Sequence, residues 1–200
     1  MLFRSQGVEG ITPLYMACQN GRKDIAKMLL DKQADLNIQN VHGGTPLIIA
    51  CQNGHKDIAK MLLDKQADVN IQDVDGATPL YMASQNGHKD ILKMLLDKET
   101  DINIQTVTGR TPLIIACQNS HEDIVKMLVD KQADVNIHEV EGWTPLYYAC
   151  LNGHKDIVKM LLDKQADVNR QIVGGVTPLR VACQMGHEEI SELLRQHGAM

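Results

Sequence analysis

Aromatic side chains are scarce in this chain, at 3% of its 200 residues, so the core must be built from Leu, Ile, Met, Val and Ala. Medium-sized side chains suit several thin stacked layers better than one large centre. The net charge of −5 lacks the basic excess typical of nucleic-acid-binding proteins. No run of eighteen apolar residues occurs, so no membrane span is predicted. The first residues, MLFRSQ, are too short and polar for a signal peptide, which favours a cytoplasmic or nuclear location.

The motifs that common enzyme classes need are also missing. The sequence contains no GxSxG turn, no GxxxxGK[ST] phosphate loop, no HExxH zinc motif and no CxxC pair. Its acidic residues recur at positions expected to face solvent, which is typical of surface charge. We therefore predict a protein that is not an enzyme, with no catalytic residues, no metal site and no cofactor.

The sequence has instead an internal repeat of 33 residues. Thr-Pro-Leu occurs six times at this interval and uses all six prolines of the chain. A glycine stands two residues before each threonine, and an alanine stands five residues after it. The repeats start at these glycines, near residues 10, 43, 76, 109, 142 and 175. Constant spacing without insertions predicts a single domain, 1–200, of six equivalent repeats.

Each repeat is predicted to form two short helices. Threonine is a good N-cap and proline suits the first helical position, so Thr-Pro begins the first helix. In the second helix of repeat two, Ile58, Met61 and Leu62 are spaced i, i+3, i+4 and form an apolar stripe. The segment 67–70 then leads into a projecting turn. Two short helices cannot bury their apolar faces alone, so we predict an all-α solenoid of stacked pairs.

With these features the chain resembles the ankyrin-repeat family over its whole length. The residues that carry the resemblance in repeat two are Gly43, Thr45-Pro46-Leu47, Ala50, Gly54-His55, Ile58, Leu62-Leu63 and Ala67-Asp68-Val69-Asn70. The resemblance implies stacked helix-turn-helix repeats with short β-hairpin fingers. It also implies that partners dock on the fingers and on the concave face of the first helices.

The cysteines and most histidines occupy fixed repeat positions. Neighbouring helices lie about 10 Å apart, too far for a disulfide between equivalent positions, so buried free thiols are predicted. The cysteines are Cys18, Cys51, Cys117, Cys150 and Cys183. The histidines after the inter-helix glycine are expected to be structural, at the start of the second helix: His55, His88, His121, His154 and His187.

Several positions depart from the family pattern. The glycine that ends the second helix is replaced by Gln33, Gln66, Glu99, Gln132 and Gln165. Each would cost about 1 kcal/mol if it took left-handed angles. Ser120 replaces the inter-helix glycine of repeat four. We therefore predict that the array is least stable at repeat four and at the joint, or packing contact, that it makes with its neighbour.

The two ends of the chain differ. The last repeat replaces apolar residues with Ser191 and Arg195 and adds glutamates, which predicts a polar cap. The first repeat keeps the residues of an interior repeat, and Met1 falls where a preceding repeat would have alanine. We predict an uncapped front, through which copies of the chain could associate.

The most varied position of the repeat stands directly before each threonine, as Ile11, Gly44, Ala77, Arg110, Trp143 and Val176. Variation in one column is typical of a binding surface, and neutral drift at exposed sites is the alternative. Repeat five holds the only Trp, and Trp, Tyr and Arg often anchor interfaces. The predicted partner site comprises Arg110, His138, Glu141, Trp143, Tyr147 and Leu151. Alternatively, Trp143 packs on its own finger and Tyr148 belongs to the core.

The family resemblance also implies hydroxylation of asparagines at Asn70, Asn136 and Asn169. The function that these observations favour is a protein–protein interaction module, with no nucleic-acid or membrane partner. The alternatives are a self-associating structural array and a regulatory segment of a larger enzyme or channel.

Overall fold

The computed structural model describes residues 8–200, and these residues are all-helical apart from turns and loops. The chain divides into two compact units, of which unit 1 ends at Asp101 and unit 2 runs from Ile102 to Met200. Unit 1 contains a short 3₁₀ turn (Val8–Gly10), α1 (Pro13–Gln19), α2 (Lys23–Asp31), α3 (Pro46–Gln52), α4 (Lys56–Asp64), α5 (Pro79–Gln85) and α6 (Lys89–Leu96). Unit 2 contains α7 (Pro112–Gln118), α8 (Glu122–Asp130), α9 (Pro145–Asn152), α10 (Lys155–Asp163), α11 (Pro178–Gln184) and α12 (Glu188–Gln196).

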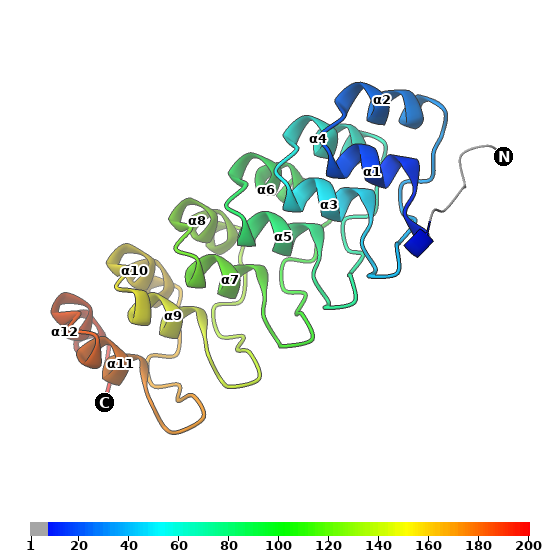
Figure 1. The fold of residues 1–200 in the computed structure, drawn as a ribbon. Coiled ribbons are helices and arrows are strands. Elements are labelled where there is room, and N and C mark those ends of the chain that lie inside the picture. Colours follow the sequence, from blue (N-terminus) through cyan, green and yellow to red (C-terminus); the bar gives the residue numbers. More distant parts are fainter. Residues whose placement is uncertain (1–7) are drawn as a thin grey trace. The chain divides into compact units, whose positions relative to one another are not determined.

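Within each unit the helices form two layers, and the loops project to one side (Figure 1). The first helices of successive repeats pack together, α1 on α3 on α5 in unit 1 and α7 on α9 on α11 in unit 2. The second helices do the same, for example α8 on α10. Leu47, Ala50 and Leu62 are fully buried between these layers. The predicted all-α stack of helix pairs is therefore confirmed.

Each first helix begins at its threonine, as the sequence predicts. In all six repeats the threonine Oγ1 accepts the backbone N–H three residues later, at 3.1 to 3.2 Å. Proline follows at the first helical position, where no N–H is needed. These caps fix where every helix pair starts, and hence where every loop leaves it.

The fingers differ from the expected β-hairpins, because no regular strand occurs in residues 8–200. Each finger is a tight turn closed by few backbone bonds. In the finger before repeat two, Asn40 N–H donates to the Gly44 carbonyl at 3.0 Å and Gly43 N–H donates to the Asn40 carbonyl at 2.9 Å. Gly43 has a φ of 75°, and a Cβ there would lie 2.7 Å from the Asp73 Cα, so only glycine fits. Two bonds per finger are too few for a strand ladder.

The glutamines that end the second helices take left-handed angles, with φ of 58° to 64° at Gln33, Gln66, Gln132 and Gln165. Glu99 is the exception among the five replaced positions and keeps a negative φ. There α6 ends at Leu96, and the Thr100 hydroxyl donates to the Leu95 carbonyl at 2.7 Å. The chain thus leaves this helix early and avoids the left-handed conformation.

The first and last repeats differ only in part as predicted. Met16, Ile25 and Met28 of repeat one are 44%, 47% and 57% exposed, whereas most equivalent residues of repeat two are buried. In the last repeat Arg195 is exposed, but Ser191 is buried and its hydroxyl donates to the His187 carbonyl at 3.0 Å. The prediction made for Met1 lies outside the described residues.

Four of the five cysteines are buried free thiols, as predicted, and Cys183 is exposed. Burial raises the pKa of the Cys18 and Cys150 thiols to about 12. Thiols that stay protonated at neutral pH are poor nucleophiles, so these cysteines act as small apolar core residues.

Candidate partner-binding site

The position before each threonine lies at the base of a finger. Its carbonyl closes the turn, as when Thr106 N–H donates to the Arg110 carbonyl at 2.9 Å and Glu139 N–H donates to the Trp143 carbonyl at 3.1 Å. Gly44 and Ala77 are buried there, and Arg110 and Trp143 are half-buried. The column is therefore not the open surface that the sequence suggested. Large residues at this position must pack against neighbouring side chains, either of the next finger or of their own repeat.

Arg110 packs in this way by binding a glutamate of the next finger. Its Nε donates to Oε2 of Glu139 at 2.5 Å, and the Tyr148 hydroxyl donates to the other oxygen, Oε1, at 3.0 Å. The Glu139 side chain is 9% exposed and that of Arg110 is 32% exposed. The carboxylate is thus shielded from water and bound on both oxygens. Burial, and then the bond to Glu139, raise the pKa of Tyr148 well above its usual value.

Trp143 forms an aromatic cluster with the two tyrosines of α9. Its ring centroid lies 4.8 Å from that of Tyr147 at an angle of 63°, and 5.1 Å from that of Tyr148 at 38°. Tyr147 and Tyr148 are only 5% and 4% exposed. Tyr148 is therefore a core residue, and Tyr147 offers little surface to a partner. Trp143 is half-buried against its own repeat.

The indole N–H of Trp143 is buried and has no hydrogen-bond acceptor among residues 8–200. Leaving a buried donor unsatisfied costs on the order of 1 to 3 kcal/mol, so such groups are rare in native structures. Stability alone therefore does not explain the Trp at this position.

The remaining predicted residues surround this cluster. Glu141 is exposed at the fingertip, and His138 is half-buried with its Nδ1 3.0 Å from the Glu139 carbonyl oxygen. Leu151 is half-exposed, four residues after Tyr147 and so on the same side of α9. The structure thus brings Arg110, Trp143 and Tyr147 to one place, with His138 and Glu141 on the adjoining finger.

Sequence reasoning missed two features of this region. The first is Glu139, whose partner Arg110 lies 29 residues away, so that no local motif marks the pair. The second is a valine at every described fingertip: Val41, Val74, Val107, Val140 and Val173 are 59% to 77% exposed. These valines recur at the same interval of 33 residues, which was a signal available in the sequence.

The repeated histidines have the structural role that was predicted. Nε2 of His55 donates to the Gln19 carbonyl and Nε2 of His88 to the Gln52 carbonyl, each at 3.2 Å. Each ring also lies against the preceding inter-helix glycine: a Cβ at Gly54 would come within 2.5 Å of the His88 ring. These bonds tie one repeat to the next.

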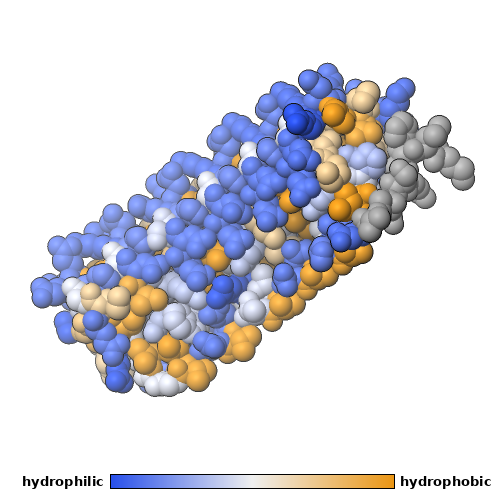
Figure 2. All heavy atoms as spheres, viewed as in Figure 1, coloured by the Kyte–Doolittle hydropathy of each residue, from blue (hydrophilic) through white to orange (hydrophobic). Residues whose placement is uncertain are grey.

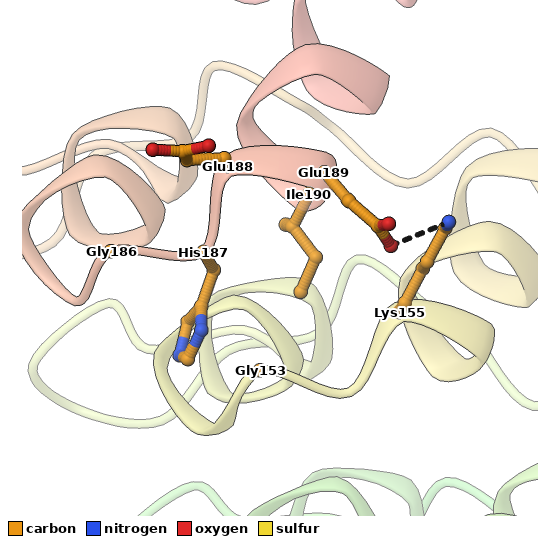
Figure 3. A pocket seen from close by; sticks show the side chains of 7 residues that line it. All are labelled: Gly153, Lys155, Gly186, His187, Glu188, Glu189 and Ile190. Carbon is orange, nitrogen blue, oxygen red and sulfur yellow. Dashed lines mark hydrogen bonds and ion pairs between the residues drawn. The ribbon is translucent and has the colours of Figure 1, made fainter.

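The same arrangement appears in the shallow hollow at the start of α12. Figure 3 shows the His187 ring directed toward Gly153, and Lys155 reaching Glu189. His187 Nε2 donates to the Leu151 carbonyl at 3.3 Å, and Lys155 Nζ lies 2.7 Å from Glu189 Oε2. His187 and Lys155 both make contacts between repeats five and six in this hollow. Neither contact pairs a nucleophile with a general base.

The asparagines with implied hydroxylation also link repeats. Asn70 Nδ2 donates to the Glu99 carbonyl at 3.2 Å, and its Oδ1 accepts the Asp101 N–H at 3.0 Å. Asn136 and Asn169 make the equivalent pairs of bonds. A hydroxylase would have to open these bonds to reach the side chain. Modification of the three asparagines remains a prediction.

In the part of the chain that the structure describes, no group of three His, Cys, Asp or Glu residues could hold a metal ion. No helix in that part is long and apolar enough to cross a membrane. The candidate site consists of an aromatic cluster, a partly buried ion pair and the exposed tips of the fingers.

The family model described as ankyrin repeats (3 copies) matches the chain from end to end, in overlapping segments 2–73, 39–106, 67–139, 82–172 and 133–200. The chain matches no curated protein in a sequence search.

Proposed function

Because the chain belongs to the ankyrin-repeat family, we propose that it is a protein–protein interaction module of the cytoplasm or nucleus. Ankyrin repeats generally bind other proteins, and this chain has the helix pairs and projecting fingers that such binding uses. The proposed partner contact lies on the fingers and first helices of repeats four and five, with Arg110, His138, Glu141, Trp143, Tyr147 and Leu151. Tyr147 acts there mainly by supporting Trp143 from below.

The observation that carries this proposal is Trp143. A large aromatic residue stands half-exposed where the other repeats have Ile, Gly, Ala, Arg or Val, and its indole N–H lacks an acceptor. Residues that break a local packing rule without a gain in stability are typical of functional positions. Trp and Arg are also the side chains that most often dominate binding energy in interfaces.

The proposal is tested by partner capture with the purified chain and with two variants. Trp143→Ala removes the proposed anchor, and Leu151→Gln introduces the residue found at this position in the other repeats. Each variant is expected to bind the captured partner at least tenfold more weakly, which corresponds to a loss of about 1.4 kcal/mol in binding free energy.

The matched control is Val176→Ala, which truncates the same column one repeat later. It is expected to leave binding unchanged. Thermal melting of all variants checks that each still folds. Full affinity of both Trp143→Ala and Leu151→Gln, with folding intact, would overturn the proposed site.

Self-association is a second candidate, favoured by the exposed Met16, Ile25 and Met28 of repeat one. Exposed apolar residues clustered on one face commonly mark an interface. Light scattering at several concentrations tests it: a monomer near 22.2 kDa at every concentration would rule it out. Dissociation on dilution, abolished by Met28→Lys, would support it.

A further inference from the structure

An exposed valine lies at the tip of each finger, and these valines form a row in each unit. In unit 2, Val107, Val140 and Val173 are 69%, 77% and 77% exposed. Figure 2 shows hydrophobic residues gathered along the loop side, while hydrophilic residues cover the second helices. Single exposed apolar residues are ordinary, but three at the same place in consecutive repeats form a continuous feature. We call these three residues the valine ridge.

Backbone bonds between the fingers hold the valine ridge in a fixed spacing. Val140 N–H donates to the Thr108 carbonyl at 3.0 Å, and Val173 N–H donates to the Glu141 carbonyl at 2.9 Å. The fingers recur once per repeat, and the first helices of successive repeats, α7, α9 and α11, are stacked at roughly 10 Å. Successive valines therefore stand about 10 Å apart. A partner that contacts all three must carry apolar side chains at that interval.

The charges next to Val140, the middle residue of the valine ridge, indicate the charge of the partner segment that lies there. Every lysine of the chain lies on a second helix or within two residues of its end, and none lies on a finger. On the helices the charges neutralise one another, as in the pair of Lys155 with Glu189. On the ridge, Glu141 is exposed beside Val140, the positive charge of Arg110 is already bound by Glu139, and Arg170 is exposed three residues before Val173.

Unit 1 repeats this design. Its Val74 stands between Asp73 and Asp75, as Val140 stands between Glu139 and Glu141, and Val41 precedes it by one repeat. No salt bridge with a lysine is found for Asp73 or Asp75, whereas Asp57 and Asp90 on the second helices are both paired. An acid–valine–acid fingertip therefore occurs once in each unit, 66 residues apart.

We propose that the valine ridge binds an extended, basic protein segment with an apolar side chain at every third residue. In the polyproline II conformation residues three apart lie on one side, about 9 Å apart, which matches the spacing of the ridge. The lysines or arginines between them face Glu141. This inference deepens the proposed function and rests on it, since it names the chemistry of a partner bound at the fingers.

The test uses a fluorescent peptide of four Pro-Leu-Lys triplets, titrated with the full chain and followed by anisotropy. The triple variant Val107→Ser, Val140→Ser, Val173→Ser is expected to bind at least tenfold more weakly. Glu141→Gln is expected to weaken binding about threefold at low salt and to reduce its salt dependence. The control Met185→Ser removes an exposed apolar residue away from the fingers and should leave affinity unchanged.

Three further peptides decide the outcome: one of scrambled order, one with Glu for Lys, and one helical peptide with Leu at every seventh residue. All three are expected to bind at least tenfold more weakly than the Pro-Leu-Lys peptide. Equal binding of any of them, no binding of the Pro-Leu-Lys peptide, or an unaffected valine variant would overturn the inference. Partner capture that depends on Trp143 would still stand in that case, so the two proposals fail separately.

Discussion

Two joints within unit 2 are held together differently. Between repeats five and six, Lys155 binds Glu189 at 2.7 Å and His187 donates to the Leu151 carbonyl at 3.3 Å. Gly153 supplies the left-handed turn, with a φ of 77°. These links lie on the helices and match those of unit 1, where Lys23 binds Asp57 at 2.7 Å.

Between repeats four and five the helix links are altered. Glu122 stands where the other joints have a lysine, so the acceptor position Asp156 faces a like charge and lies 3.8 Å from Lys159 of its own helix instead. Ser120 holds the left-handed turn at a φ of 65°, and its hydroxyl bonds His154 Nε2. The finger side compensates, since Arg110, Glu139 and Tyr148 form a shielded network there.

The comparison shows that two successive repeats can be held together either by contacts between their helices or by contacts between their fingers. Exposed ion pairs on helices contribute little, about 0.2 to 1 kcal/mol each. A shielded carboxylate that accepts two hydrogen bonds costs more when one partner is removed, because a half-buried charge is then left unpaired. Substitutions in the fourth joint should therefore be most damaging at a few finger residues that adjoin the proposed binding site.

The largest expected effect comes from Glu139→Ala. It leaves the Arg110 guanidinium half-buried without its carboxylate and the buried Tyr148 hydroxyl without an acceptor, so the free energy of unfolding should fall by about 2 to 3 kcal/mol. Glu189→Ala, in the exposed pair of the next joint, should lower the free energy of unfolding much less, because water and salt screen that pair. Urea unfolding measures both, and equal losses would abolish the contrast between the joints.

Exchanging the residues at the left-handed turns gives the next effect. Gly153→Ser places a Cβ 2.6 Å from the His187 ring and should cost about 1 to 2 kcal/mol. Ser120→Gly relieves the backbone but removes the hydroxyl that bonds His154 Nε2, so the net gain should be below about 1 kcal/mol. Hydrogen exchange should show repeat four as the least protected of unit 2 before the change and better protected after it. The best protection in repeat four of the unchanged chain would contradict the weakness predicted there.

Tyr148→Phe removes the tyrosine hydroxyl and leaves the ion pair of Arg110 with Glu139 in place, so it isolates the contribution of the hydroxyl. It should cost about 1 kcal/mol near neutral pH, because Glu139 loses one donor. The folded state raises the pKa of Tyr148, chiefly by burial, so its contribution is complete below pH 10 and is lost as pH rises above that value. Unfolding at several alkaline pH values should therefore show the stability gap between variant and unchanged chain closing above pH 10. A gap that is constant with pH would argue against a raised pKa of Tyr148 in the folded state.

The smallest effect on the free energy of unfolding is expected from the charged residues at the start of the second helices. Glu122→Lys supplies the missing lysine opposite Asp156 and should stabilise by about 0.3 to 0.5 kcal/mol at low salt. The reverse change, Lys155→Glu, should destabilise the next joint, because it places a like charge opposite Glu189. Both effects should shrink in 1 M salt, where surface charges are screened, and salt-independent values would point to a cause other than charge.

The repeat architecture follows from the sequence because each of its signals recurs. Thr-Pro fixes the start of every first helix, and the apolar stripe of Ile58 and Leu62 fixes the buried face of the second. Repetition makes such signals additive, so a weak preference in one repeat becomes a definite pattern across six.

The site was only partly predictable, for a physical reason. Trp143 and Arg110 stood out as unusual residues, but their exposure depends on how neighbouring fingers pack. Tyr147 looked like a surface anchor and proved to be buried under Trp143. Glu139 looked like one more surface acid until the register of adjacent fingers placed it beside Arg110. Such a pairing occurs between only two of the repeats, so no repeated sequence pattern predicts it.

The regular joints also bear on how such an array changes during evolution. Each of the repeats that use the lysine link carries both halves of a joint, a donor for the next repeat and an acceptor for the previous one, as Lys56 and Asp57 do side by side. Copies of this kind can be duplicated, deleted or exchanged without losing their contacts. Arg110 and Glu139 divide one joint between two particular repeats. A recombination that separates repeats four and five would therefore leave Arg110 and Glu139 each without its charged partner.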